Sequence, residues 1–123
     1  MKRLGDAELE IMLAVWGAGE PVSSTYVQSK LKGRRDWPLT AVLTSLNRLV
    51  VKGFLAVEKQ GRANYYRPLV SESEYKAAEG RGLINRLYGG SFTDMAAALY
   101  DGRAISREDL AELREYLDKL EDQ

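Results

Sequence analysis

The 123-residue sequence contains no cysteine and no histidine. The lack of cysteine excludes disulfides and thiolate metal sites, and the lack of histidine removes the commonest metal ligand and the commonest general base. Catalysis would have to rest on carboxylates, lysine, tyrosine or serine alone. We therefore expect a protein that is not an enzyme and that holds no metal and no cofactor.

The sequence also lacks long hydrophobic runs. No stretch of about eighteen apolar residues is present, so we expect no membrane-spanning segment and no membrane partner. Residues 1–6 become acidic before the apolar core of a signal peptide could form, which predicts a cytoplasmic protein. Hydrophobic residues still make up 45% of the chain, which is enough for a packed core.

A net charge of zero conceals an uneven distribution of charge. Residues 1–70 contain 11 basic and 6 acidic side chains, whereas residues 71–123 contain 7 and 12. Within residues 30–67 there are nine basic residues, and the only acidic ones are Asp36 and Glu58. A basic region inside a neutral chain is the electrostatic footprint of nucleic-acid binding, and a chance imbalance on a solvated surface is the alternative.

The first half of the chain has the pattern of helices followed by a hairpin. The predicted elements are helices over residues 6–16, 23–32 and 38–52 and strands over residues 54–59 and 64–69. Gly53 ends the third helix, and Gly61 and Arg62 lie at the tip of the predicted hairpin. Of the adjacent Tyr65 and Tyr66, one should face the core. This order is typical of a winged helix-turn-helix, so we expect a mostly α fold with a small β-hairpin wing.

The two faces of the third predicted helix differ in chemistry. One face is apolar and suits a core; its members are Val42, Leu46, Leu49 and Val50. The other carries short polar side chains that allow close approach to a base edge, together with cations for phosphates. Leu43 on this face either meets a thymine methyl group or packs on a neighbouring element. The predicted DNA-binding residues are Thr40, Leu43, Thr44, Asn47, Arg48, Lys52, Arg62 and Arg67.

Three more helices are predicted in the second half, beginning near Ser71, Ser91 and Ser106. The last two carry apolar stripes with little to pack against, and leaving them in water forfeits about 25 cal/mol for each Å² of apolar surface. Packing against the same segment of a second chain solves this, whereas folding back on the first half is the alternative. The predicted dimerisation residues are Phe92, Met95, Leu99, Leu110, Leu113 and Leu117.

The expected organisation is therefore a winged-helix DNA-binding domain over residues 1–70 and a helical dimerisation domain over residues 71–123. Several ordered motifs resemble the penicillinase-repressor family, that is, BlaI-, MecI- and CopY-type winged-helix transcriptional repressors. The similar segments are the opening run over residues 4–16, Trp37, the pattern from Thr44 to Gly53, Gly61-Arg62 ahead of Tyr65-Tyr66, and residues 84–92.

This resemblance implies a homodimer that represses transcription from a palindromic operator, such as that of β-lactamase-type antibiotic-resistance genes. It places Thr40, Leu43, Thr44 and Arg48 on DNA, with Arg62 in the wing. In antibiotic-sensing members a signal-activated protease cuts the helix after the Gly-Gly-Phe region. The matching bond here is Ala98–Leu99, where the Asn-Phe pair of those members is absent. The cysteine-based copper sensing of another branch is excluded.

Two other functions fit the same sequence features. A winged helix with an acidic second half also suits a protein-interaction module. A small-molecule-sensing regulator would need a pocket between the wing domain and the dimer helices, and the candidates to line it are Tyr75, Tyr88 and Tyr100. Salt-dependent retention on nonspecific DNA separates the repressor from the interaction module.

Overall fold

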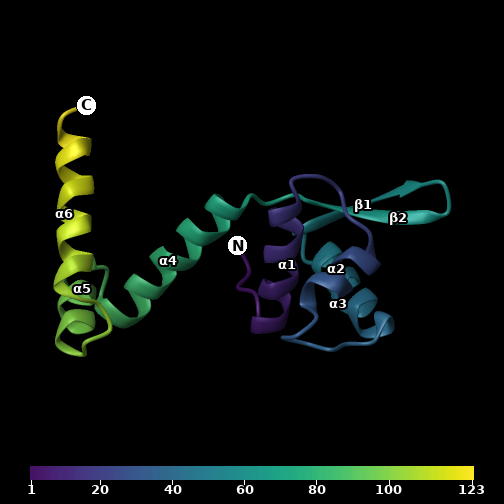
Figure 1. The fold of residues 1–123 in the computed structure, drawn as a ribbon, viewed down its shortest axis with the longest axis horizontal. Coiled ribbons are helices and arrows are strands. Elements are labelled where there is room, and N and C mark those ends of the chain that lie inside the picture. The colour runs from purple at the N-terminus through teal and green to yellow at the C-terminus, as the bar shows by residue number, and fades with distance from the viewer. The chain divides into compact units, whose positions relative to one another are not determined.

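A computed structural model describes all 123 residues and contains six helices and one antiparallel hairpin (Figure 1). The elements are α1 Asp6–Ala18, α2 Ser24–Leu31, α3 Leu39–Val51, β1 Leu55–Gln60, β2 Ala63–Pro68, α4 Glu72–Tyr88, α5 Phe92–Asp101 and α6 Arg107–Glu121. The predicted winged helix-turn-helix is confirmed, and every predicted element is present with ends that differ by a few residues at most. No helix has the length and apolar character needed to cross a membrane.

The chain divides into two compact units, Met1–Glu79 (the N-terminal unit) and Gly80–Gln123 (the C-terminal unit). The division lies inside α4, later than the predicted boundary after residue 70. The reason is Tyr75, which is buried in the N-terminal unit although α4 carries it. The first turns of α4 therefore belong structurally to the winged-helix unit.

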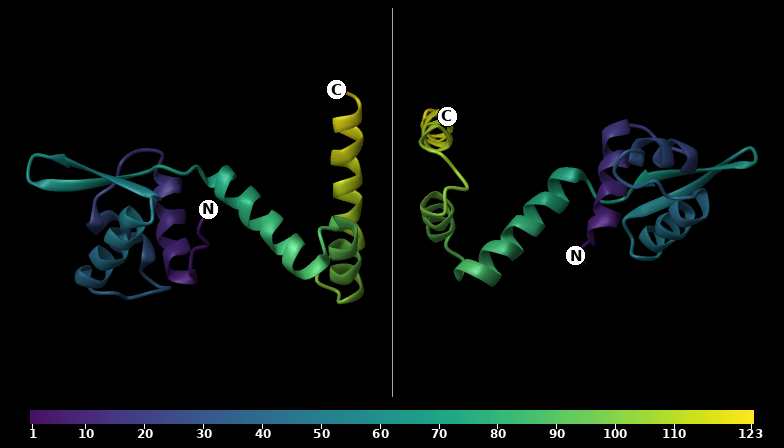
Figure 2. Two further views of the ribbon diagram at one scale, coloured as in Figure 1. Left: turned by 180° about the vertical axis from the view of Figure 1, so that it is seen from behind. Right: turned by 60° about the horizontal axis from the view of Figure 1, so that its bottom comes forward.

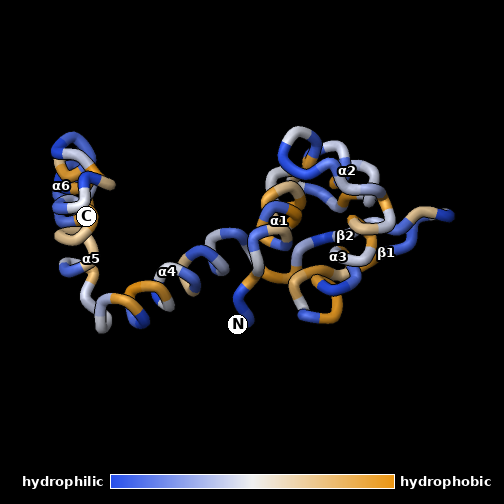
Figure 3. Tube along the Cα trace, turned by 90° about the horizontal axis from the view of Figure 1, so that it is seen from below, coloured by the Kyte–Doolittle hydropathy of each residue, from blue (hydrophilic) through white to orange (hydrophobic).

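The core of the N-terminal unit lies between its helices and the base of the hairpin. Hydrophobic residues recur along α1 and α3 (Figure 3), and Ile11, Val42 and Leu46 are completely buried. Ahead of α2, Val22 exchanges two backbone hydrogen bonds of 3.0 and 2.8 Å with Tyr66 of β2. This isolated bridge attaches the start of α2 to the sheet, so the helices and the hairpin share one core.

The hairpin extends away from the three helices as a two-stranded wing (Figure 2). Gln60 pairs with Ala63, which leaves Gly61 and Arg62 as the two-residue turn. Gly61 has φ +64°, the conformation that this tight turn requires at its first central position and that glycine adopts without strain. The turn therefore holds Arg62 at the tip. Of the two tyrosines, Tyr66 faces the core, as one of the pair was expected to do.

The C-terminal unit consists of the rest of α4 together with α5 and α6. Serine caps begin α5 and α6 as predicted. Ser91 accepts from the Asp94 N–H at 3.0 Å, and Ser106 accepts from the Asp109 N–H at 3.1 Å. Asp109 completes a capping box by accepting from the Ser106 N–H at 2.7 Å. No residue of α5 or α6 is buried in the single chain.

Candidate DNA-binding surface

The outer face of α3 is free of the protein's own core. Thr40, Thr44 and Asn47 follow one another at intervals of four and three residues, so they share one side of the helix, and all three are exposed. Arg48 beside them is exposed as well. On the opposite side Leu46 and its apolar neighbours are completely buried. The fold thus holds α3 by one face and presents the other to solvent.

Thr44 has a defined hydrogen-bonding state within this surface. Its hydroxyl donates to the backbone carbonyl of Thr40 at 2.9 Å. With its proton used in this bond, the exposed Oγ1 atom keeps its lone pairs as acceptors. Thr44 is therefore equipped to accept a hydrogen bond from an exocyclic amino group of adenine or cytosine.

Leu43 is half-buried and is not among the partly buried side chains that pack on the core. Packing on the core of the N-terminal unit therefore does not account for this leucine beside the exposed face of α3. A contact with a thymine methyl group stays a prediction for it.

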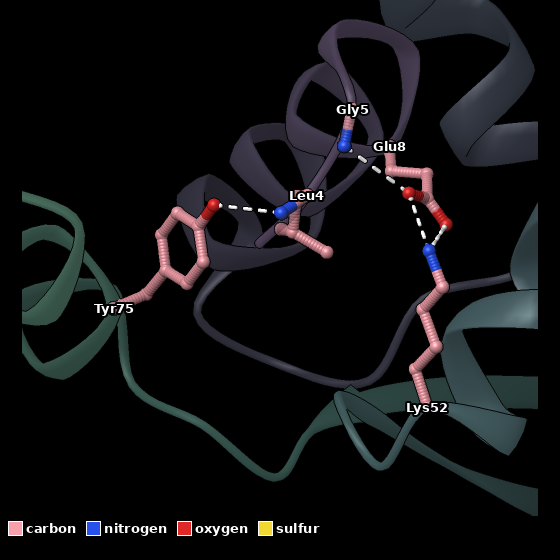
Figure 4. A network of polar contacts seen from close by, with 5 residues as sticks. All are labelled: Leu4, Gly5, Glu8, Lys52 and Tyr75. Atoms are coloured by element: carbon pink, nitrogen blue, oxygen red, sulfur yellow. Dashed lines mark hydrogen bonds and ion pairs between the residues drawn. The ribbon is translucent and has the colours of Figure 1, made fainter. Parts of the chain in front are cut away.

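Lys52, one of the predicted DNA-binding residues, is engaged inside the fold. Its ammonium group donates at 2.7 Å to both carboxylate oxygens of Glu8 in the first turn of α1 (Figure 4). Glu8 also accepts from the Gly5 N–H at 3.2 Å. Burial alone would raise the pKa of Glu8, but these hydrogen bonds and the charges of Lys52 and Arg48 hold that pKa below its ordinary value. The positive charge of Lys52 is therefore largely compensated within the protein.

The two arginines of the wing differ in whether an acidic side chain compensates their charge. Arg62 at the tip of the hairpin is exposed and makes no ion pair, whereas Arg67 on β2 forms an ion pair with Glu58 on β1. Because both members of this pair are exposed, water screens it and a phosphate can compete for Arg67. Arg62 is accordingly the stronger candidate for a phosphate contact.

The turn before α3 contains interactions that were not predicted. Arg35 forms an ion pair with Glu10 of α1, and its guanidinium lies over the ring of Trp37 at 5.5 Å from the centroid. The Gln28 side chain donates to the Trp37 carbonyl at 3.0 Å. These contacts fix the chain just before α3 begins, so the start of α3 is held by both α1 and α2.

Tyr75 does not line a pocket as the small-molecule hypothesis required. Its side chain is only 4% exposed. Its hydroxyl accepts a hydrogen bond from the Leu4 N–H at 2.9 Å, and its ring packs edge-on against Phe54 with centroids 5.7 Å apart. Tyr75 is therefore not available as a lining residue for that alternative, because several elements distant in sequence converge on its ring.

The predicted dimerisation residues all lie on α5 and α6 and keep solvent-accessible apolar surface. Phe92 is 50% exposed and Leu117 is 46% exposed. The other four are half-buried: Met95, Leu99, Leu110 and Leu113. The Ala98–Leu99 bond lies inside α5, where the Ala98 carbonyl accepts from the Gly102 N–H at 3.0 Å and the Leu99 carbonyl accepts from the Ala104 N–H at 2.8 Å.

Comparison with known proteins gives full-length matches. A sequence family described as penicillinase repressor matches residues 4–119. The penicillinase repressor of Bacillus licheniformis is 30% identical over 117 residues, which cover 95% of this chain and 91% of that protein. The methicillin resistance regulatory protein MecI of Mammaliicoccus sciuri is 28% identical over 116 residues, which cover 94% of each chain.

A solved structure provides a similar winged helix. The solution structure of the monomeric form of Bacillus licheniformis BlaI, in complex with the blaP half-operator, is 34% identical to this chain with a TM-score of 0.51. The match covers 60% of this chain and 89% of that one.

Proposed function

The chain belongs to the penicillinase repressor family and is a DNA-binding transcriptional repressor, and we propose that it covers a palindromic operator as a homodimer. The observation that carries the DNA contact in this proposal is the uncovered face of α3. Thr40, Thr44 and Asn47 are exposed there beside Arg48, while the rest of the helix is fixed in the core. A helix mounted in this way can enter a major groove without rearrangement of the domain.

Phosphate contacts supply most of the affinity in this mechanism. Arg48 and Arg62 are exposed and free of ion pairs, so they can neutralise phosphates and release counterions. Thr44 then selects among sequences through the lone pairs of its exposed hydroxyl, at about 1–3 kcal/mol for a good base contact. Affinity should fall steeply with salt, whereas discrimination between sequences should depend on the polar side chains of α3.

The composition of the C-terminal unit supports a second copy of this chain as its partner. The unit has 44 residues, close to the size below which single domains need outside support. None of the residues of α5 and α6 is buried, although both helices carry apolar stripes. A twofold contact through Phe92 and Leu117 would cover these stripes and place two recognition helices on two half-sites.

The names of the relatives support a role in resistance. The relatives described above are named as a penicillinase repressor and as a methicillin resistance regulatory protein. We accordingly propose that this chain represses genes of antibiotic resistance. From the family resemblance we also propose release by a signal-activated protease that cuts between Ala98 and Leu99. Because that bond lies in a hydrogen-bonded helix, the protease would have to unwind the end of α5 before it could cut.

Footprinting and binding assays test the proposal. The full chain is footprinted on the region upstream of its own gene, and the protected duplex, a half-site and a scrambled duplex are then titrated at 50–200 mM salt. We expect two protected half-sites, preference for the protected duplex, and a linear decrease of log affinity with log salt. Equal affinity for the protected and the scrambled duplex, or binding that does not change with salt, would contradict it.

A further inference from the structure

The segment before α1 is held in place at Leu4. The Leu4 side chain is buried, and its N–H donates to the hydroxyl of Tyr75 at 2.9 Å (Figure 4). Lys2 is only two residues from this anchor, and two extended residues span at most about 7 Å. The backbone of Lys2 therefore cannot move far from the position that Leu4 sets.

The two basic residues of this segment have different surroundings. Arg3 forms an ion pair with Glu79 of α4 at 2.9 Å. Lys2 makes no ion pair with any residue of the chain and lies instead beside the C-terminal half of the recognition helix. It lines a shallow hollow together with Thr44, Asn47, Arg48, Val51 and Lys52. The anchored segment thus brings a cation from outside α3 to the edge of the predicted DNA-binding face.

The chemistry of this hollow suits an anion. Three of its lining residues are basic and none is acidic. Of the three, Lys52 already donates to both oxygens of Glu8, so its charge is compensated. Lys2 and Arg48 remain as the cations without an ion pair, and they approach the hollow from different segments of the chain.

We propose that Lys2 binds a DNA phosphate next to the major-groove position of α3. This proposal rests on the proposed function, because it requires α3 to be the helix that meets DNA. A lysine is a flexible point charge and reads no base pattern, so its contact should raise affinity for all sequences alike. In this arrangement Lys2 supplies the phosphate contact that Lys52, held by Glu8, does not.

The test compares two neighbouring variants that remove the same formal charge. Lys2→Ala and Arg3→Ala are each measured in the full chain by fluorescence anisotropy on the operator duplex and on a scrambled duplex, over 50–200 mM salt. For Lys2→Ala we expect affinity to fall about threefold to tenfold on both duplexes and the salt slope to decrease by about 0.9, the value for one lost phosphate contact. Lys2→Arg should restore the slope, and Arg3→Ala should change neither quantity.

Arg48→Ala serves as the reference for the recognition surface itself. If Arg48→Ala weakens binding while Lys2→Ala leaves the salt slope unchanged, the role of Lys2 is refuted and the function of α3 stands. An equal effect of Arg3→Ala and Lys2→Ala would also refute the role of Lys2. The lower net positive charge of the protein, rather than a lost phosphate contact, would then explain the weaker binding. If neither Arg48→Ala nor Lys2→Ala changes binding, the exposed face of α3 is not the DNA-binding surface. Both the proposed function and the proposed role of Lys2 then fail.

Discussion

Lys52 and Glu8 connect α3 to α1 through hydrogen bonds of 2.7 Å from one ammonium group to both carboxylate oxygens. Lys52 caps the C-terminal end of α3, and Glu8 lies in the first turn of α1. Because Glu8 also accepts from the Gly5 N–H, one carboxylate fixes both the start of α1 and the end of α3.

Glu8→Gln should therefore destabilise the N-terminal unit. The neutral amide keeps the shape of the side chain but loses the charge-assisted hydrogen bonds, and we expect a loss of about 1–2 kcal/mol in the free energy of unfolding. Urea denaturation followed by circular dichroism measures this change. Glu20→Gln is the matched control, since Glu20 is exposed and makes no ion pair, and it should leave the midpoint unchanged.

The same carboxylate predicts a pH dependence. The pKa of Glu8 is lower in the folded chain than its ordinary value of 4.5, so the contribution of Glu8 to stability is present in full above that value. It is lost as the pH falls through the folded-state pKa, because protonated Glu8 can no longer pair with Lys52. Between pH 7 and pH 3 the wild type should lose more stability than Glu8→Gln. Parallel curves for the two proteins would contradict the pairing.

Thr44→Ala should relax the choice of sequence rather than abolish binding. We expect the difference in binding free energy between operator and scrambled duplexes to shrink by about 1–3 kcal/mol, with little change on the scrambled duplex. Competition anisotropy measures both. Thr25→Ala removes a hydroxyl from an exposed position of α2 and serves as the control. An equal loss on both duplexes would show that Thr44 touches only the DNA backbone.

Leu117→Glu should separate the proposed dimer. Leu117 is 46% exposed on the apolar stripe of α6, and a charge buried there in a twofold contact would be unpaired. Light scattering after size exclusion should show a monomer, and affinity for the full palindrome should fall toward that for a half-site. Ala111→Glu places the same side chain about 120° around α6 from Leu117, at an exposed position outside the predicted dimerisation residues, and should leave the dimer intact. Dimers in both variants would exclude this stripe as the interface.

Tyr75→Phe should destabilise the N-terminal unit by about 1–3 kcal/mol, because the buried Leu4 N–H would lose its acceptor. Urea denaturation measures the loss, with the exposed Tyr116→Phe as control. If Lys2 depends on the Leu4 anchor, Tyr75→Phe should also reduce the salt slope of DNA binding. A Tyr75→Phe protein as stable as the wild type would mean that water satisfies Leu4.

Local signals in the sequence were sufficient to predict the helices and the hairpin. Ser91 and Ser106 mark helix starts, and Gly61 marks the hairpin turn, through interactions that span only a few residues. The exposed face of α3 followed from its periodicity in the same way.

Contacts between distant residues could not be read from the sequence. Lys52 and Glu8 are separated by 44 positions, and Leu4 and Tyr75 by 71. No local pattern showed that Lys52 would be held by Glu8 or that Tyr75 would be buried. The Leu4–Tyr75 pair also explains why the N-terminal unit extends into α4 and why Lys2 was not among the predicted DNA-binding residues.

The absence of buried residues in α5 and α6 has a consequence for gene control. In the proposed dimer, these helices gain their core only from the second copy, and their stability then depends on how many copies are present. Operator occupancy would then rise more steeply than in proportion to repressor abundance. A modest drop in the amount of intact protein, whatever its cause, would empty the operator sharply, and the controlled gene would switch on within a narrow range of repressor levels.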